Sequence, residues 1–353
     1  MKALRVYGKQ DFRLEEVEEP QAGPGEVKLA VRYCGICGSD VHDYIDGPRL
    51  LPVSRPHPQT GRMAPITYGH EFSAEVTDIG AGVSGIAPGA RVVVRPTMPC
   101  YRCQYCREGR SIQCTELAAI GGAADGAFAR YVTVRADCVL PLPDSVSWQA
   151  GAYVEPLACA VRAVRRSRLE PGAVAAVIGA GPIGLLTMQM AMACGAQAVH
   201  VFETEAHRRE LALQMGATTA HDPRDGDPGR IIGALTKGRR ADIVFECAGS
   251  GPALHLADAV CGRGGTILEM GVHREPVSFD FFNLFFREKS IVTSQGYTNA
   301  EFEIAIAFLT NGKVNPHPAM TSATIPLDDV MSEGFAALLG PERAAHCKIL
   351  VTP

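Results

Sequence analysis

A short glycine-rich turn between an apolar segment and a helical segment constrains the fold of this chain more than any other feature. Val174–Ile178 is continuously apolar, which is typical of a strand buried on both faces. Gly179-Ala180-Gly181-Pro182-Ile183-Gly184 follows it directly, and Pro182–Cys194 has a helical pattern. A strand, a tight turn and a helix in this order predict the first half of a βαβ unit, and therefore a parallel sheet.

The segments that follow continue the alternation of strand and helix. We expect strands at Val199–Glu203, Asp242–Glu246 and Thr266–Met270, and a charged helix at Glu205–Met215. This pattern predicts an α/β fold with a doubly wound parallel sheet.

The glycine spacing also predicts a dinucleotide site. Gly179 permits the tight turn, Gly181 lets a pyrophosphate approach the backbone, and Gly184 lets helix and strand pack closely. The helix that begins at Pro182 and Ile183 directs its N-terminus at the phosphates. We therefore predict that these five residues contact the cofactor.

An acidic residue at the end of the second strand indicates which dinucleotide is bound. Glu203 lies 24 positions after Gly179, where a carboxylate accepts hydrogen bonds from the adenosine ribose and repels a 2′-phosphate. The pattern favours NAD over NADP. Arg208 and Arg209 stand nearby and are able to pair with a phosphate, so Arg208 is also a candidate cofactor contact.

The N-terminal part of the chain has a different rhythm. Up to about residue 150, Gly and Pro punctuate short β-type runs, which predict a barrel-like β domain. These runs are Val27–Val31, Ala74–Ile79, Arg91–Val94 and Ala129–Val134. After Tyr297 we expect one helix, Ala300–Leu309, and a final strand, Lys348–Thr352, in a segment that rejoins the first domain.

Four closely spaced cysteines predict a structural metal site. Cys100, Cys103, Cys106 and Cys114 provide four thiolates at a spacing that suits closed tetrahedral zinc. The residues between them are polar and cannot form a core, so the metal would hold this loop. An iron–sulfur cluster is the alternative, because its ligands can have a similar spacing.

A second set of metal-ligand residues is spread along the first 155 residues. Cys37, His70 and one glutamate, either Glu71 or Glu155, would give three protein ligands and leave a position open for chemistry. Each residue alone is more often structural than a ligand. These fragments by themselves leave the choice between a catalytic zinc and ordinary structural roles open.

Composition excludes several classes of partner. The net charge is −4 and the isoelectric point about 6.2, which gives no general attraction to nucleic acid or anionic membranes. The local basic cluster Arg162, Arg165, Arg166 and Arg168 is expected to be a solvated helix end. No apolar run is long enough for a membrane span, and the first 20 residues lack a signal-peptide core. Twelve cysteines without a secretory signal predict a reducing, cytoplasmic location.

Several motifs in one order identify a family resemblance. CGICGSDVH, GHEFSAEV, the spaced cysteines, EPLA and GAGPIG follow one another along the chain. Over its whole length the chain resembles the zinc-dependent medium-chain dehydrogenase/reductase superfamily, and it is most similar to the butanediol and sorbitol dehydrogenase branch. The insert DGPRLLPVSRPHPQTGRMAPITYGHEF is especially similar to that of 2,3-butanediol dehydrogenases.

The resemblance implies the domain organisation and the activity. It implies a GroES-like catalytic domain from residues 1–155 and 298–353, with a structural zinc lobe at 96–115, and a Rossmann domain at 156–297. It further implies a homodimer or homotetramer. The implied reaction moves a hydride from a secondary alcohol to NAD, with a vicinal diol such as 2,3-butanediol as substrate, or with acetoin in the reverse direction.

The resemblance also implies roles for individual residues. Cys37 and His70 would bind the catalytic zinc, and Glu71 or Glu155 would be the next ligand. Ser39 would contact the substrate oxygen and His42 would pass the proton to solvent. Asp40 would support a ligand, while Cys34 matches no ligand position. Cys100, Cys103, Cys106 and Cys114 match the structural zinc lobe.

Other functions remain as alternatives. Many sorbitol dehydrogenases have an arginine where this chain has Gly296, before Tyr297, which favours vicinal diols over sorbitol. A sugar alcohol, an amino alcohol such as threonine and a simple secondary alcohol are the other substrate classes. A non-catalytic protein that binds NAD and zinc would be expected to lack part of the Cys37, Ser39 and His70 set. A zinc-ribbon nucleic-acid binder conflicts with the charge and with the Rossmann segment.

Overall fold

The computed structural model describes residues 1–353, which form two compact units. Unit 1 comprises Met1–Glu155 and Pro316–Pro353, and unit 2 comprises Pro156–Asn315. No helix in the structure is both long enough and apolar enough to cross a membrane.

Unit 2 is built on a six-stranded sheet in which every neighbouring pair of strands is parallel. Its strands are β11 (Val174–Ile178), β12 (Ala198–Phe202), β13 (Thr219–His221), β14 (Ala241–Glu246), β15 (Cys261–Glu269) and β16 (Ser290–Thr293). Its helices are α5 (Pro182–Ala193), α6 (Ala206–Gln214), α7 (Pro228–Leu235), α8 (Gly251–Val260), α9 (Phe281–Phe286) and α10 (Asn299–Thr310), together with most of α4 (Val154–Ser167).

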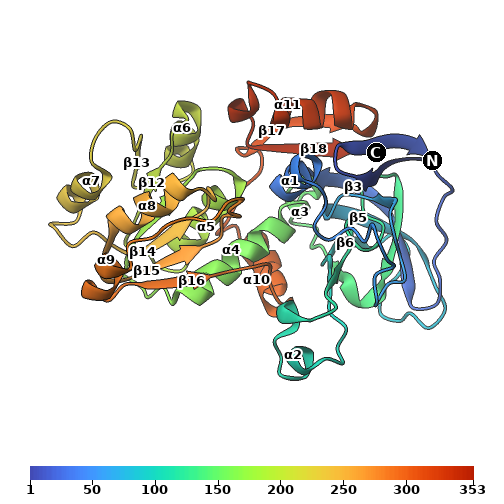
Figure 1. Ribbon diagram of the computed structural model, residues 1–353. Helices are drawn as coiled ribbons and strands as arrows, with labels where there is room; N and C mark the ends of the chain where they lie inside the picture. Colours follow the sequence, from blue (N-terminus) through green and yellow to red (C-terminus); the bar gives the residue numbers. More distant parts are fainter. The chain divides into compact units, whose positions relative to one another are not determined.

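The strand order shows how the sheet is wound. The order is β13-β12-β11-β14-β15-β16, so the chain leaves β11 in one direction and later returns to continue from β14 in the other. Because such crossovers are right-handed, α5 and α6 cover one face and α8 covers the opposite face, around the sheet seen in Figure 1. The predicted doubly wound parallel sheet is confirmed, with its switch point between β11 and β14.

Unit 1 is mainly β structure. Its strands are β1 (Lys2–Gly8), β2 (Asp11–Glu16), β3 (Glu26–Gly35), β4 (Ile66–Thr67), β5 (Glu71–Ile79), β6 (Arg91–Val94), β7 (Thr97–Met98), β8 (Ala118–Ala119), β9 (Tyr131–Arg135), β10 (Val139–Pro141), β17 (Thr321–Pro326) and β18 (Lys348–Thr352). Its helices are α1 (Gly38–Asp46), α2 (Gln104–Arg107), α3 (Trp148–Gly151) and α11 (Ala336–Leu339).

The central strand of unit 1 positions the candidate metal ligands. β3 pairs with β5 along its length, with β9 near its start and with β18 near its end. Alternate apolar residues of these strands form one core, which includes Leu29, Val31 and Phe72. The register places Gly35 opposite Glu71, so the end of β3 and the start of β5 meet where α1 begins. The loop that carries α2 projects from this unit (Figure 1).

The segment around α10 differs from the sequence-based expectation. We expected residues 298–353 to belong with the first domain, but Asn299–Thr310 packs within unit 2, and only residues from Pro316 onward belong to unit 1. A buried carboxylate explains this placement. Glu301 binds Arg165 at 2.7 Å and lies 3.6 Å from Arg162, and both arginines are on α4.

This contact also corrects the expectation for the basic cluster. The Arg162 side chain is only 13% exposed, so this residue is not part of a solvated helix end. Its charge is compensated inside unit 2 by Glu301, which a pattern of local charges could not reveal.

Candidate functional site

The predicted ligands of the catalytic metal come together in unit 1. One ligand atom each from Cys37, His70 and Glu71 lies within 4.8 Å of the others. Cys37 caps the start of α1, and His70 and Glu71 stand where the chain enters β5. The fold therefore joins two segments that are about 30 residues apart in the sequence.

Asp40 links the start of α1 to the imidazole of His70. Its Oδ2 accepts the backbone N–H of Cys37 at 3.0 Å, and its Oδ1 lies 3.5 Å from Nδ1 of His70. Burial raises the pKa of Asp40 to about 6, and the charge of His70 opposes this rise. A carboxylate on Nδ1 fixes the tautomer that presents Nε2 to a metal, as is usual for a zinc-bound histidine.

The electrostatics of this cluster suit a cation. Burial lowers the pKa of His70, but Asp40 and Cys37 outweigh burial and hold it well above its usual value. Burial and the charge of Glu71 raise the pKa of the Cys37 thiol. The imidazole of His70 therefore keeps a positive charge among anionic side chains. A divalent ion bound to deprotonated Cys37 and neutral His70 would supply that positive charge in its place. The donor set fits zinc.

The two candidate glutamates have different surroundings. Glu71 is almost completely buried, and its Oε2 accepts a hydrogen bond from Nζ of Lys348 at 2.6 Å. Lys348 also donates to the carbonyl of Ile36. Glu155 lies in the first turn of α4 and outside the three-residue cluster, although its charge raises the pKa of His70.

Lys348 is a site residue that sequence reasoning missed. It comes from β18, at the far end of the chain, and no local motif marks it. The side chain is almost fully buried, and the charge of Glu71 raises its pKa above the usual value against the opposing effect of burial. Its contact with Glu71 neutralises one carboxylate beside the predicted metal ligands Cys37 and His70.

The two predicted relay residues lie on α1. Ser39 and His42 are three positions apart, so they share one face of the helix directly after Cys37. Ser39 is exposed, and the His42 side chain is 37% exposed with its Nδ1 4.0 Å from Asp46. Both predicted relay residues therefore follow the predicted ligand Cys37 on α1 and reach solvent.

The four cysteines of the projecting loop also converge. The sulfur atoms of Cys100, Cys103, Cys106 and Cys114 lie within 4.8 Å of one another. Backbone N–H groups point at them, from Cys103 to Cys100 and from Cys100 to Cys114, each at 3.3 Å.

The ionisation of these thiols suits a metal. Backbone N–H groups lower the pKa of Cys103 to about 6, whereas burial and neighbouring thiols raise the pKa of Cys106 to about 12. A cation would allow all four to ionise. The loop between the cysteines has two short helices, and Ile112 is the one buried residue in them. The loop therefore has almost no core of its own.

The glycine turn of unit 2 has the geometry that the motif predicts. Gly179 has a φ of 92°, and a Cβ there would lie 3.2 Å from Cβ of Ala248. A Cβ on Gly184 would lie 1.9 Å from the carbonyl oxygen of Gly179, so α5 packs against the turn only because this residue is glycine. A Cβ on Gly181 would meet nothing, which leaves that backbone open to a ligand. Pro182 and Ile183 form the first turn of α5.

Glu203 lies against this turn. Its Oε2 accepts the N–H of Ala180 at 2.7 Å and its Oε1 accepts the N–H of Glu205 at 3.0 Å. Of the two nearby arginines, Arg209 binds the carbonyl of Glu203 and the carboxylate of Asp222, which compensates its charge. Arg208 lies one residue earlier on the same helix, α6.

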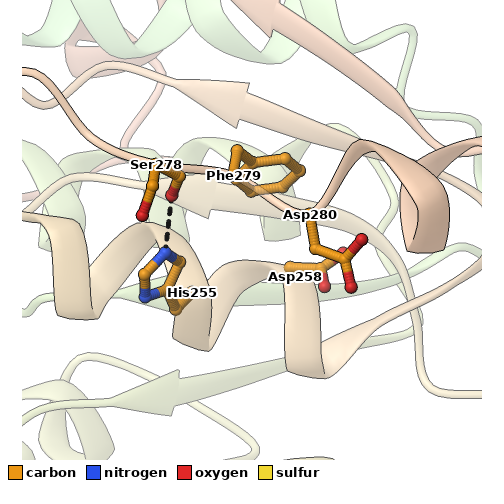
Figure 2. A pocket seen from close by; sticks show the side chains of 5 residues that line it. All are labelled: His255, Asp258, Ser278, Phe279 and Asp280. Carbon is orange, nitrogen blue, oxygen red and sulfur yellow. Dashed lines mark hydrogen bonds between the residues drawn. The ribbon is translucent and has the colours of Figure 1, made fainter.

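A pocket elsewhere in unit 2 contains none of these residues. Its volume is about 450 Å³ and its lining consists of His255, Asp258, Ser278, Phe279 and Asp280. Figure 2 shows His255 and Asp258 on α8, with a hydrogen bond of 2.8 Å between Nε2 of His255 and the carbonyl of Ser278. The pocket has neither the glycine turn nor the predicted metal ligands, and it is not a candidate for the active site.

Comparison with known proteins identifies the family. Residues 23–144 match the alcohol dehydrogenase GroES-like domain, and residues 182–311 match the zinc-binding dehydrogenase family. The (R,R)-butanediol dehydrogenase of Bacillus subtilis (strain 168) is 36% identical over 353 residues, which cover 100% of both chains. The sorbitol dehydrogenase of Halalkalibacterium halodurans is 33% identical and covers 100% of this chain and 99% of its own.

The fold agrees with these relatives. The crystal structure of 2R,3R-butanediol dehydrogenase from Bacillus subtilis matches this chain with a TM-score of 0.93 and 36% identity, and covers 100% of this chain and 99% of its own. The chain therefore belongs to the zinc-dependent medium-chain dehydrogenase/reductase superfamily, in its butanediol and sorbitol dehydrogenase branch, and is an alcohol or polyol dehydrogenase that uses zinc and a nicotinamide cofactor.

Proposed function

We propose that this enzyme oxidises a secondary alcohol of the vicinal diol class, such as 2,3-butanediol, with NAD, and reduces acetoin in the reverse direction. The observation that carries the proposal is the convergence of Cys37, His70 and Glu71 in a chain with full-length similarity to a butanediol dehydrogenase. A diol would suit the site because a zinc ion held there could take a neighbouring hydroxyl as a further ligand.

Five residues of unit 1 have separate roles in this reaction. Cys37 and His70 would hold a zinc ion that supplies Lewis acidity to the alcohol oxygen, and a nicotinamide cofactor would supply the hydride acceptor. Ser39 accepts the hydroxyl proton while its own hydroxyl proton passes on toward His42. His42 passes it to water, because an imidazole exchanges protons near neutral pH and this one is partly exposed. Asp40 holds the imidazole of His70 in position.

The third protein ligand is either Glu71 or Glu155. Glu71 lies within the cluster but is already bound to Lys348, whereas Glu155 acts on His70 through its charge. Zinc content of Glu71→Gln and of Glu155→Gln distinguishes them. The ligand is the residue whose replacement weakens zinc retention, while replacement of the other leaves the zinc in place.

A panel of alcohols tests the substrate class. NADH formation is measured with 2,3-butanediol, sorbitol, threonine and propan-2-ol, together with NADH consumption with acetoin. We expect kcat/KM for the vicinal diol to exceed that for each other class by about tenfold or more. Comparable or faster turnover of another class would overturn the diol assignment, and no turnover of any alcohol would overturn the reaction class.

Sorbitol oxidation is the second candidate function. The 33% identical sorbitol dehydrogenase favours it, whereas Gly296, in place of the arginine common in that group, disfavours it. The same panel separates the two, since a sorbitol dehydrogenase would have its highest kcat/KM with the longer polyol.

We also propose that Glu203 makes the enzyme prefer NAD over NADP. Its carboxylate stands against the glycine turn, where an adenosine ribose would meet it, and it would repel a 2′-phosphate. In Glu203→Ala we expect the preference for NAD over NADP, as a ratio of Kd values, to fall by about tenfold or more. Glu203→Gln, which keeps an acceptor for Ala180, separates loss of charge from loss of the turn contact. An unchanged ratio in both variants would contradict the assignment.

We further propose a homodimer or homotetramer in the cytoplasm. Phe281, Phe282, Phe285 and Phe286 of α9 are 60–75% exposed, and β16 is an edge strand beside them, so a second copy would bury both. None of the 12 cysteines forms a disulfide bond, as a reducing compartment allows. Sedimentation equilibrium tests the assembly, and a monomer at micromolar concentration would contradict it.

A further inference from the structure

Two glutamates stand side by side at the edge of the parallel sheet in unit 2. Glu246 ends β14 and Glu269 ends β15, and the register pairs them directly across the two strands. Paired residues of neighbouring strands point to the same face. This is the face on which Val244 and Ile267 pack with residues of α8. Two carboxyl groups are therefore adjacent in a largely apolar layer.

The two carboxyl groups differ in their hydrogen bonds. Glu246 is completely buried, and its Oε1 accepts the N–H groups of Ala248 at 2.8 Å and Gly249 at 3.0 Å. These donors fix the orientation of its carboxyl group. Glu269 is 13% exposed, and both of its oxygen atoms are buried without a hydrogen-bond partner. Burial and the neighbouring Glu246 raise the pKa of Glu269 to about 9.

An imidazole completes the group. The chain turns at Gly271 and returns His273 over the two carboxyl groups. Its Nε2 lies 3.3 Å from Oε1 of Glu269 and 3.7 Å from Oε2 of Glu246. Its side chain is 20% exposed, but both ring nitrogens are buried and neither makes a hydrogen bond. Unpartnered buried polar atoms of this kind require a partner.

We propose that Glu246, Glu269 and His273 of unit 2 bind a divalent transition-metal ion, in addition to the two zinc ions predicted for unit 1. One ligand atom of each residue lies within 4.8 Å of the others. Two ligand atoms that each lie about 2.0–2.2 Å from one ion, at a tetrahedral angle, are roughly 3.3–3.6 Å apart. The distances from Nε2 of His273 to the two carboxylate oxygens, 3.3 Å and 3.7 Å, are close to this separation. Two carboxylates and one imidazole suit Zn²⁺ or Mn²⁺.

The site requires the glycine at position 271. A Cβ there would lie 2.4 Å from Oε2 of Glu246 and 2.2 Å from the backbone nitrogen of Gly249, so this close approach excludes any side chain. The space beside Oε2 is thus kept for the returning loop. An ion bound here would join the ends of β14 and β15 to that loop and balance two negative charges in a buried layer.

The site also lies close to the cofactor loop. Glu246 holds the N–H of Ala248, and Ala248 is the residue that packs against Gly179. An ion would therefore stabilise the segment that supports the glycine turn. Its binding should be detectable as a higher unfolding temperature, without reference to turnover.

Metal counting in the full-length protein tests the proposal. The zinc and manganese retained per chain are measured by elemental analysis after exposure to excess Mn²⁺ and gel filtration, for the wild type and for Glu269→Gln and His273→Gln. We expect the wild type to hold one ion per chain more than either variant. Glu275→Gln, which removes an exposed carboxylate two positions from His273, serves as the matched control and should retain the wild-type count.

Two measurements distinguish an ion bound here from an ion in the catalytic centre. They also distinguish it from a proton shared by the carboxyl groups of Glu246 and Glu269. Mn²⁺ added to protein that holds two zinc ions per chain, the number expected for the two zinc sites of unit 1, should bind with one site per chain by electron paramagnetic resonance, and its affinity should fall by about tenfold or more in both variants. It should also raise the unfolding temperature of the wild type and of Glu275→Gln, but not that of Glu269→Gln or His273→Gln. Equal metal counts and equal Mn²⁺ affinities in wild type and Glu269→Gln would overturn the proposal. The result does not depend on the ligands of unit 1, because those residues are unchanged.

Discussion

At the scale of single residues, the side chain of Asp40 contributes both to the local fold and to the predicted metal site. Its carboxylate accepts the N–H of Cys37 at the start of α1 and faces Nδ1 of His70. The first contact fixes where the helix begins, and the second fixes the orientation of the imidazole. Because both partners are predicted ligands, a change at Asp40 acts on the metal without touching it.

We predict that Asp40→Asn weakens zinc retention by about 10–100-fold, since the amide keeps an acceptor for Cys37 but loses the charge that supports His70. Competition with a fluorescent zinc chelator measures the change, and circular dichroism checks that α1 persists. Asp78→Asn on the exposed part of β5 is the control. Unaltered zinc affinity in Asp40→Asn would remove this residue from the metal site.

At the scale of elements, the loop that carries α2 depends on its cysteines. Four sulfur atoms converge there, while almost no apolar residue of the loop is buried. An element of this composition lacks the apolar burial that offsets the cost of ordering its backbone. Its order should therefore follow the metal, while the sheet of unit 1 retains its own core.

We predict that Cys106→Ser lowers the zinc content by one ion per chain and unfolds the loop locally. Hydrogen exchange should increase over residues 96–115 and remain slow in β3 and β5, because these strands pack in the main core. Cys138→Ser, which removes a buried thiol outside the loop, controls for loss of a cysteine. Wild-type protection of the loop in Cys106→Ser would contradict a structural role for the metal.

A buried histidine in the sheet of unit 2 predicts a dependence of stability on pH. His200 lies on β12 and is almost fully buried, with Nδ1 2.9 Å from Oγ1 of Thr219. Burial, and then the charge of His221, lower the pKa of His200. The unfolded chain therefore binds a proton near pH 6.5 that the folded chain does not bind, and the free energy of unfolding falls as the pH falls below this value.

We predict that His200→Gln reduces this slope by at most about 1.4 kcal/mol per pH unit. Urea unfolding between pH 7 and pH 5 measures it, with the exposed His255 replaced by Gln as the control. If His200→Gln has the wild-type slope and His255→Gln does not, the buried histidine is not the titrating group.

At the scale of the whole molecule, the architecture could be predicted because its signals are local. Val174–Ile178 and Lys348–Thr352 were predicted with the strand bounds that the structure has, and the helix at Pro182 ends one residue earlier than predicted. Each segment has a hydrophobic period and a boundary residue that a single stretch of sequence displays. β15 begins five residues before its predicted start, because Gly264 and Gly265 obscure the strand pattern.

The contacts between distant segments could not be predicted in the same way. Lys348 reaches Glu71 only through the pairing of β18 with β3, and Glu301 joins α10 to α4 through an ion pair across more than 130 residues. Glu246 and Glu269 are each unremarkable in sequence, and only strand register makes them neighbours. Tertiary pairing, not local pattern, creates these groups.

One measurement tests the central claim, that a zinc ion held by Cys37 and His70 drives the oxidation of an alcohol. Zinc content, NAD affinity and NADH formation from 2,3-butanediol are measured together in wild type, Cys37→Ala and the control Cys34→Ala, a buried cysteine outside the ligand cluster. We predict that Cys37→Ala alone loses one zinc ion and about a thousandfold or more of kcat, because a Lewis acid contributes several kcal/mol, while NAD still binds. Full turnover by Cys37→Ala, or by wild-type protein without metal, would contradict the account.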